Sequence, residues 1–333
     1  MMKLESTYIN ESKNSLRLPW LDIAKGIAMV AVVFSHEFAS VKIMVLFCNS
    51  FMLPLFFMCS GYCISPRKYI FVDYIRKKIQ NLLIPYLLLG LLVSFLQVFT
   101  NGFNEIINNV MENLFSWQTL WFLPVLFIAD IISYYVETKF PISLKILIYS
   151  VLFVLAIILC ITKCSLPLNI DVVPISIYYL LIGILIKNNI NNIHSRYMFI
   201  SGLSFFLLGV LILCFTKGNL ILKLNDIYPL YKIIFSTFES LGILLVLSQF
   251  GNYSNELCLK NLAKIIEYIG KNSMVIFAFH MPIFFYCQTF LRPCIDSPIL
   301  YKMIEFILIW GICFLLIPFM KRYLPLFIGK RNN

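Results

Sequence analysis

Charged residues are scarce in this sequence. Asp, Glu, Lys and Arg make up 13% of the 333 residues, about half the share of a typical soluble domain, whereas hydrophobic residues make up 60%. The mean hydropathy is +0.87. Apolar runs close to the ~20 residues that a helix needs to cross a bilayer recur along the whole chain. The composition therefore excludes a soluble globular domain and predicts an integral membrane protein.

Long polar stretches between the apolar runs are missing as well. We therefore expect one membrane domain at residues 19–322, between cytoplasmic tails at residues 1–18 and 323–333. The first apolar run contains Asp22 and Lys25 and has no small-residue cleavage pattern behind it. A cleaved signal peptide is for this reason not expected.

Paired cysteine motifs are absent. The ten cysteines occur singly and mostly inside apolar runs, without the spacing of a metal site or of a disulfide framework. We interpret them as small apolar side chains and expect no metal. The net charge of +11 could indicate a nucleic-acid partner, but basic residues in cytoplasmic loops explain it, so none is expected.

The apolar runs predict an all-α bundle of ten transmembrane helices. Their expected ranges are 20–40, 43–64, 82–100, 119–136, 142–162, 172–186, 197–216, 230–250, 268–290 and 299–320. Loops on the side of the termini hold 19 Lys and Arg, against 7 on the other side. The positive-inside rule then predicts that both termini are cytoplasmic. We expect the basic segment 65–81 along the cytoplasmic surface and the acidic loop 101–118 outside.

Three ionisable residues, Asp22, Lys25 and His36, stand between Leu21 and His36 of the first predicted span. Lys25 and His36 are eleven residues apart, about three helical turns, so they project to the same side, with Asp22 close to that face. Taken singly, His36 could be a buried structural histidine, and the ammonium of Lys25 could extend to the cytoplasmic interface. Neither reading explains why they share a face.

Further ionisable residues are predicted inside later spans. His280 and Glu239 lie in the ninth and eighth spans, and Asp130 and Glu305 are further embedded acids. Ionisable groups in a bilayer usually mark function. Two histidines with several carboxylates could form a proton path or an acid/base site, and their spacing does not decide between these.

Five stretches, in order, resemble motifs of the acyltransferase 3 family of polytopic membrane acyltransferases, many of which O-acetylate sugars of surface polysaccharides. They are WLDIAKGIAMVAVVFSH (20–36), FMLPLFFMCSGYCI (51–64), RKKIQNLLIPY (76–86), LWFLPVLFIADI (120–131) and IGKNSMVIFAFHMPI (269–283). Two positions depart from the family pattern. The basic residue of the first motif is Lys25 where arginine is usual, and Asn81 stands where the third motif usually has a second arginine.

The resemblance implies an O-acetyltransferase of the inner (plasma) membrane that moves an acetyl group from cytoplasmic acetyl-coenzyme A to a saccharide hydroxyl. It implies the coenzyme as a substrate, with no tightly bound cofactor, and glycan assembly machinery as a further partner. His36 would be the general base or an acyl-carrying nucleophile, Glu239 would orient it, and His280 would share the cavity. The expected substrate- or donor-binding residues are Asp22, Lys25, Arg76, Lys77, Lys78, Asn272, Ser273 and Trp121.

Some of these residues also have structural explanations. Asn272, Ser273 and His280 could serve as a helix cap or in hydrogen bonds between helices, and Trp121 could anchor the outer interface. The competing function is a proton-coupled transporter or flippase of a saccharide or lipid-linked intermediate. That function predicts repeated halves with broken helices, which the sequence lacks. A structural or sensory membrane protein would leave the shared face of Lys25 and His36 unexplained.

Overall fold

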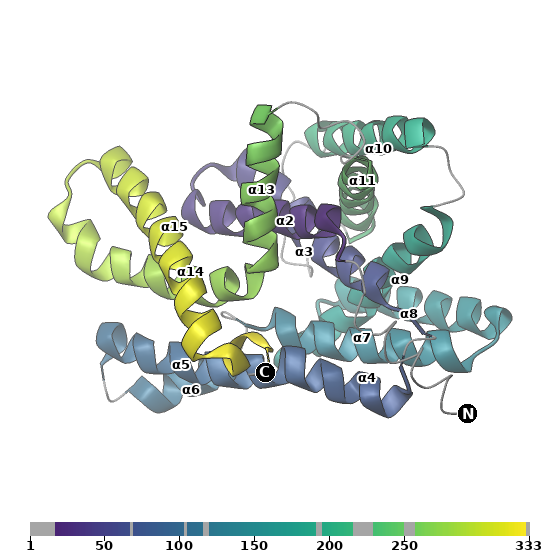
Figure 1. Cartoon of the computed structure of the whole chain (residues 1–333), viewed down its shortest axis with the longest axis horizontal. Coiled ribbons are helices and arrows are strands. Elements are labelled where there is room, and N and C mark those ends of the chain that lie inside the picture. Colours follow the sequence, from purple (N-terminus) through teal and green to yellow (C-terminus); the bar gives the residue numbers. More distant parts are fainter. Residues whose placement is uncertain are drawn as a thin grey trace.

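The computed structural model describes residues 17–66, 69–102, 105–115, 120–190, 195–215, 229–249 and 257–330. Every element in these ranges is a helix (Figure 1). The longer ones are α2 (Pro19–Glu37), α3 (Lys42–Cys63), α5 (Ile84–Asn101), α7 (Phe122–Lys139), α8 (Ile142–Thr162), α9 (Val173–Asn189), α10 (Ser195–Phe215), α11 (Pro229–Ser248), α13 (Leu257–Lys271), α14 (Ser273–Tyr286) and α15 (Pro298–Tyr323).

Apolar helices long enough to cross a bilayer are the main feature of the fold. Six in the described ranges meet that requirement: Lys42–Cys63, Phe71–Thr100, Ile142–Thr162, Pro167–Asn189, Ser273–Cys294 and Pro298–Tyr323. Ser195–Leu211 and Ile233–Ser248 are shorter apolar helices. Each of the ten predicted ranges overlaps a described helix, but α2 and α7, which carry ionisable residues, are not among the six. The chain is therefore a multi-pass membrane protein, while ten spans and cytoplasmic termini stay predictions.

The segment before the third predicted span differs from expectation. Instead of a surface segment followed by a separate span, α4 (Phe71–Lys78) continues through a π-helical turn, η1 (Ile79–Leu83), into α5. The three elements form one long rod in Figure 1. A π turn keeps the backbone hydrogen-bonded. The helix therefore continues from α4 into α5, while its side chains change direction around the helix axis.

Two short helices were not predicted as separate elements. α6 (Ile106–Phe115) occupies the loop expected at 101–118 and packs against α5. α13 precedes α14 as a helix of its own, with a turn at Asn272 between them, so the predicted span 268–290 begins in the wrong helix. After α14 come η5 (Cys287–Leu291) and η6 (Arg292–Cys294), and η7 (Pro325–Ile328) near the C-terminus packs on α5.

Glycines bring α2 and α13 into backbone contact. A Cβ atom at Gly26 would lie 2.0 Å from the carbonyl oxygen of Ile266, and one at Gly270 would lie 1.7 Å from that of Asp22. Only glycine permits such a close approach, a common device between helices in membranes. α13 crosses α2 in Figure 1, and this contact holds the half of α2 that carries Asp22 and Lys25.

A second glycine contact joins α3 to α9. A Cβ atom at Gly61 would lie 2.0 Å from the carbonyl oxygen of Leu180, and one at Gly183 would lie 2.0 Å from that of Met58. α2, α3, α9 and α13 thus form a closely packed centre, whereas α8 and α15 leave most of their apolar surface exposed. The ionisable residues of α2 are therefore held by a rigid part of the bundle.

Candidate active site

Two histidines from distant parts of the chain lie side by side. His36 is in the last turn of α2 and His280 is in the middle of α14, and their ring centroids are 5.5 Å apart at an interplanar angle of 47°. His280 is 3% exposed, whereas His36 keeps an exposed surface. The pair combines one histidine that a substrate can reach with one that is fixed in the protein.

Backbone carbonyl groups fix the hydrogen position of His280. Its Nδ1 atom lies 3.0 Å from the carbonyl oxygen of Ile276 and 2.9 Å from that of Phe277. Both partners are acceptors, so Nδ1 of the neutral ring carries the hydrogen and Nε2 keeps its lone pair. Nε2 is buried and has no hydrogen-bond partner among the described residues. It is therefore available to accept a hydrogen bond.

A cavity of about 290 Å³ begins one helical turn from this pair. Val32, one turn before His36, and Phe277, just under a turn before His280, both line it. Lys25 lines it on the same side of α2 as Val32. Its other lining residues come from α3, α4, η1, α7 and α14, among them Ser60, Lys78, Leu82, Phe122 and Ser273. The two lysines thus line this cavity, and the histidines lie about one turn beyond its lining residues on α2 and α14.

The two lysines of the cavity differ in what they contact. Lys78 pairs with Asp130 of α7, which is 0% exposed and also accepts from Ser60 Oγ at 3.0 and 3.1 Å. Lys25 has no hydrogen-bond or ion-pair partner among the residues described here. Lys25 is therefore the available cation of the cavity, while Asp130 neutralises Lys78.

Arg76 and Lys77 point away from this cavity. Arg76 is exposed and lies 3.4 Å from Asp73, one turn before it on α4. Lys77 is also exposed and donates to the hydroxyl of Tyr69 at 2.8 Å. Of the three consecutive bases predicted to bind the donor, the structure places only Lys78 in the cavity. A helix turns about 100° per residue, so three neighbouring side chains cannot share one direction.

The other predicted donor residues are divided between the cavity and the helix packing. Asp22 is buried and accepts from Arg17 Nε at 2.5 Å. Asn272 is buried at the turn before α14 and donates to the carbonyl oxygen of Tyr268 at 2.6 Å. Ser273 lines the cavity, and Trp121 directly precedes α7 and packs on Phe122. Asp22 and Asn272 thus have partners within the protein.

Glu239 has a different neighbour from the one expected. It is 0% exposed on α11, and its Oε2 accepts from Ser50 Oγ of α3, while Oε1 has no hydrogen-bond partner among the described residues. Among the described residues, neither His36 nor His280 forms a hydrogen bond with Glu239. The structure therefore does not show Glu239 orienting His36.

A buried carboxylate near His36, that of Glu37, was missed in the sequence. Glu37 directly follows His36, is 1% exposed, and its Oε1 lies 3.4 Å from Lys302 Nζ. Lys302 also lies 2.6 Å from Glu305 Oε2. The available signal was the position of Glu37 inside the first predicted span, where an unpaired carboxylate is unfavourable.

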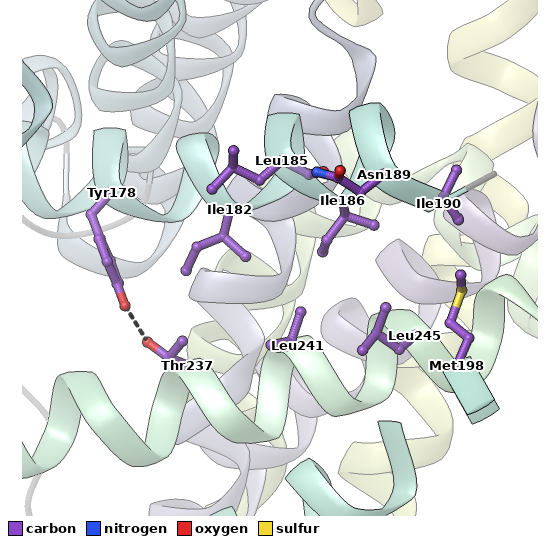
Figure 2. A pocket seen from close by; sticks show the side chains of 10 residues that line it. All are labelled: Tyr178, Ile182, Leu185, Ile186, Asn189, Ile190, Met198, Thr237, Leu241 and Leu245. Atoms are coloured by element: carbon purple, nitrogen blue, oxygen red, sulfur yellow. Dashed lines mark hydrogen bonds between the residues drawn. The ribbon is translucent and has the colours of Figure 1, made fainter. Parts of the chain in front are cut away.

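A larger cavity of about 380 Å³ lies between α9, α10 and α11 (Figure 2). Leucine and isoleucine side chains face one another across it, and Tyr178 and Thr237 meet at one end with their oxygens 3.3 Å apart. No acidic or basic side chain lines it. Its lining therefore offers no carboxylate, imidazole or ammonium group for proton transfer or for binding an anion.

Comparison with known proteins identifies the family of the chain. The sequence profile described as "Acyltransferase domain" matches residues 18–325, which is nearly the whole chain. The chain belongs to the acyltransferase 3 family. No curated protein and no solved structure matches it. The matched range includes α2, α14 and every residue that lines the cavity beside the histidines of this membrane acyltransferase.

Proposed function

We propose that this membrane acyltransferase moves an acetyl group from cytoplasmic acetyl-coenzyme A to a hydroxyl of a surface or exported saccharide. One observation carries the proposal: the paired histidines stand one turn from a cavity that contains Lys25 and Lys78. Proton transfer and anion binding are the two functions that such a reaction requires of the protein.

His36 serves as the general base. The saccharide hydroxyl oxygen attacks the thioester carbonyl carbon while its proton moves to the free nitrogen of His36. The carbon–sulfur bond then breaks, and the proton passes from the imidazolium to the departing thiolate, which leaves as the thiol. General base catalysis of this kind contributes about 10²–10⁴-fold to the rate.

His280 orients His36 in this mechanism. A neutral imidazole has one N–H and one lone pair, so it can act as a base only through the nitrogen without hydrogen. If the N–H of His36 donates to Nε2 of His280, the opposite nitrogen of His36 presents its lone pair to the substrate. The unpartnered Nε2 of His280 and the 5.5 Å separation of the rings support this arrangement.

Lys25 binds an anionic part of the donor. Coenzyme A carries phosphates, which are attracted to an ammonium group, and Lys25 is the lysine of this cavity without a protein partner among the described residues. Lys78 lines the same cavity, but its charge is neutralised by Asp130, which Ser60 also stabilises. The distribution of basic residues predicts that the segment containing Lys78 lies on the cytoplasmic side. We therefore expect the donor to enter the cavity from that side.

Mass analysis of surface glycans tests this function. Cells that express the chain should gain acetyl groups on a glycan, and cells that express equal amounts of His36→Ala should not. Release of free thiol from acetyl-coenzyme A by the purified protein in lipid vesicles, in the presence of that glycan, gives the matching measurement in vitro. Acetylation that does not depend on the chain would refute the proposal.

A further inference from the structure

We propose that a cluster of four cations, Arg17, Lys271, Lys321 and Lys330, binds the ribose 3′-phosphate of the coenzyme A donor at one end of the cavity beside the histidines. The inference rests on the proposed function and deepens it, because it assigns a site to the part of the donor that lies farthest from the reacting carbon. None of the four cations lines the cavity itself.

The first two cations meet where α2 and α13 touch. A Cβ atom at Gly270 would lie 1.7 Å from the carbonyl oxygen of Asp22. The carboxylate of Asp22 accepts from Arg17 Nε at 2.5 Å, and Lys271 directly follows Gly270. Arg17 and Lys271 therefore belong to the same helix contact.

The end of α15 brings the other two cations to this contact. Lys321, in the last turn of α15, lies over the ring of Tyr268 of α13, with its Nζ atom 5.3 Å from the ring centroid. Tyr268 precedes Lys271 by three residues, just under one helical turn. After α15 the chain turns back through η7, where the amide nitrogen of Lys330 donates to the carbonyl oxygen of Pro325 at 2.8 Å. Pro325 follows Lys321 by four residues, so the two lysines belong to the same end of α15.

The charges of the cluster do not balance among the described residues. Its first two cations each pair with a carboxylate, Asp22 and Glu267 respectively. Lys321 and Lys330 have no carboxylate partner in the same ranges. The charges of the other three cations act on Lys321. Like charges held close together are unfavourable unless an anion lies among them.

Two general rules explain only part of this arrangement. The positive-inside rule accounts for basic residues on the side predicted to be cytoplasmic. A lysine in the last turn of a helix, such as Lys321, is also favoured by the helix dipole. Neither rule explains why cations from separate parts of the chain gather at one place, whereas an anionic ligand does.

The cluster is joined to one end of the cavity beside the histidines. Ser273, which lines that cavity, follows Lys271 by two residues. A Cβ atom at Gly329, the residue before the fourth cation, would lie 2.9 Å from the Cα atom of Asn81. Asn81 directly precedes Leu82, another lining residue. In Figure 1 the chain end marked C accordingly lies beside the rod of α4, η1 and α5.

The histidines lie towards the other end of the same cavity. Along α14 the chain runs from Ser273 to His280, and along α2 it runs from Lys25 to His36. The eleven residues from Lys25 to His36 span about 16 Å of helix. A donor whose thioester reaches His36 would therefore extend its nucleotide end towards the cluster.

The charge of the donor explains why cations outside the cavity are needed. Coenzyme A carries a diphosphate group and a separate ribose 3′-phosphate, both at the end of the molecule opposite the thioester. Inside the cavity, Lys25 is available, but Lys78 is neutralised by Asp130. One ammonium group does not balance all of these phosphates. The uncompensated charges of Lys321 and Lys330 match the outermost one.

Dephospho-coenzyme A, which lacks only the 3′-phosphate, provides the test. Its binding and that of coenzyme A are measured by titration calorimetry on the purified protein in neutral detergent. The wild type should bind coenzyme A about tenfold more tightly, the effect of one charge-assisted contact. In Lys321→Met/Lys330→Met this preference should disappear, while the affinity for dephospho-coenzyme A stays nearly unchanged.

Lys260→Met/Lys264→Met is the matched control. It removes two exposed lysines from the first half of α13, and the nearer of them is seven residues, about 10 Å of helix, from Lys271. At 0.15 M salt, charges at this distance are largely screened, so the tenfold preference should remain. Lys321→Arg keeps the charge and should also keep most of the preference.

Several results would overturn the proposal. They are a wild type that binds both compounds equally or binds neither, an equal loss of affinity for both in Lys321→Met/Lys330→Met, or a lost preference in the control. Anionic lipid headgroups are the other source of phosphate. If the variant loses bound phosphatidylglycerol in native mass spectrometry but keeps the preference for coenzyme A, the cluster binds lipid instead. If the double variant does not fold, Lys330→Met alone, at an exposed position, should reduce the preference to about threefold.

The binding experiment does not require transfer to a glycan. A preference that depends on Lys321 and Lys330, in a protein that acetylates no glycan, would refute the proposed function and leave the phosphate site in place. Glycan acetylation by a protein whose preference is unchanged in Lys321→Met/Lys330→Met would refute the phosphate site and leave the function in place.

Discussion

The ion pair between Lys78 and Asp130 allows a quantitative test of how the cavity is built. Asp130 is 0% exposed, and in Lys78→Met it keeps only Ser60 as a hydrogen-bond donor, at 3.0 and 3.1 Å. Removing one partner of a buried pair costs about 3–5 kcal/mol. The Lys78 side chain is 18% exposed and borders a cavity that water can enter, so we expect about 3 kcal/mol, the lower end of that range.

Unfolding of the purified protein in detergent micelles, followed by tryptophan fluorescence, measures this loss. Lys77→Met is the matched control, because the neighbouring lysine is exposed and its change should stay within about 0.5 kcal/mol. The double variant Lys78→Met/Asp130→Leu should regain most of the stability, since it removes both charges together. If Lys78→Met is as stable as Lys77→Met, the Lys78–Asp130 ion pair does not contribute to the stability of the fold as argued here.

Three further predictions concern the donor, the packing and the topology. Lys25→Met should raise the KM for acetyl-coenzyme A about tenfold, because one charge contact with the donor is lost, while kcat stays nearly unchanged. An unaltered KM would show that Lys25 does not bind the donor. Gly270→Ala should reduce stability by about 1–3 kcal/mol in the same unfolding assay, because its methyl group meets the carbonyl oxygen of Asp22, and a neutral effect would contradict the contact. A tag after Asn333 should react only from the cytoplasm, and labelling from outside would reverse the topology.

The helices were largely predictable, because runs of apolar residues and their periodicity depend on local sequence. All ten expected ranges contain a helix, and α8 matches its range at both ends. The continuity of α4 with α5 was not predictable, since a π turn leaves no clear mark in composition. The separation of α13 from α14 at Asn272 was also missed, although Lys271, Asn272 and Ser273 interrupt the apolar residues at this turn.

The residues of the site were easier to predict than their partners. Helical spacing alone predicts a common face for Lys25 and His36, and the structure puts Lys25 and Val32, one turn before His36, on the same cavity. The pairing of Glu239 with Ser50, and of Glu37 with Lys302, joins helices far apart in the sequence. Such pairs depend on how helices rotate and cross, which a single sequence does not determine.

The central claim is that His36 takes the proton of the acceptor hydroxyl, and the rate of acetyl transfer by purified His36→Gln tests it most directly. Glutamine keeps hydrogen-bonding groups but cannot take a proton near neutral pH. We predict a loss of about 10²-fold or more in kcat, in protein that is folded and expressed like the wild type. Transfer by His36→Gln at a rate near that of the wild type would contradict the account and make His36 a structural histidine.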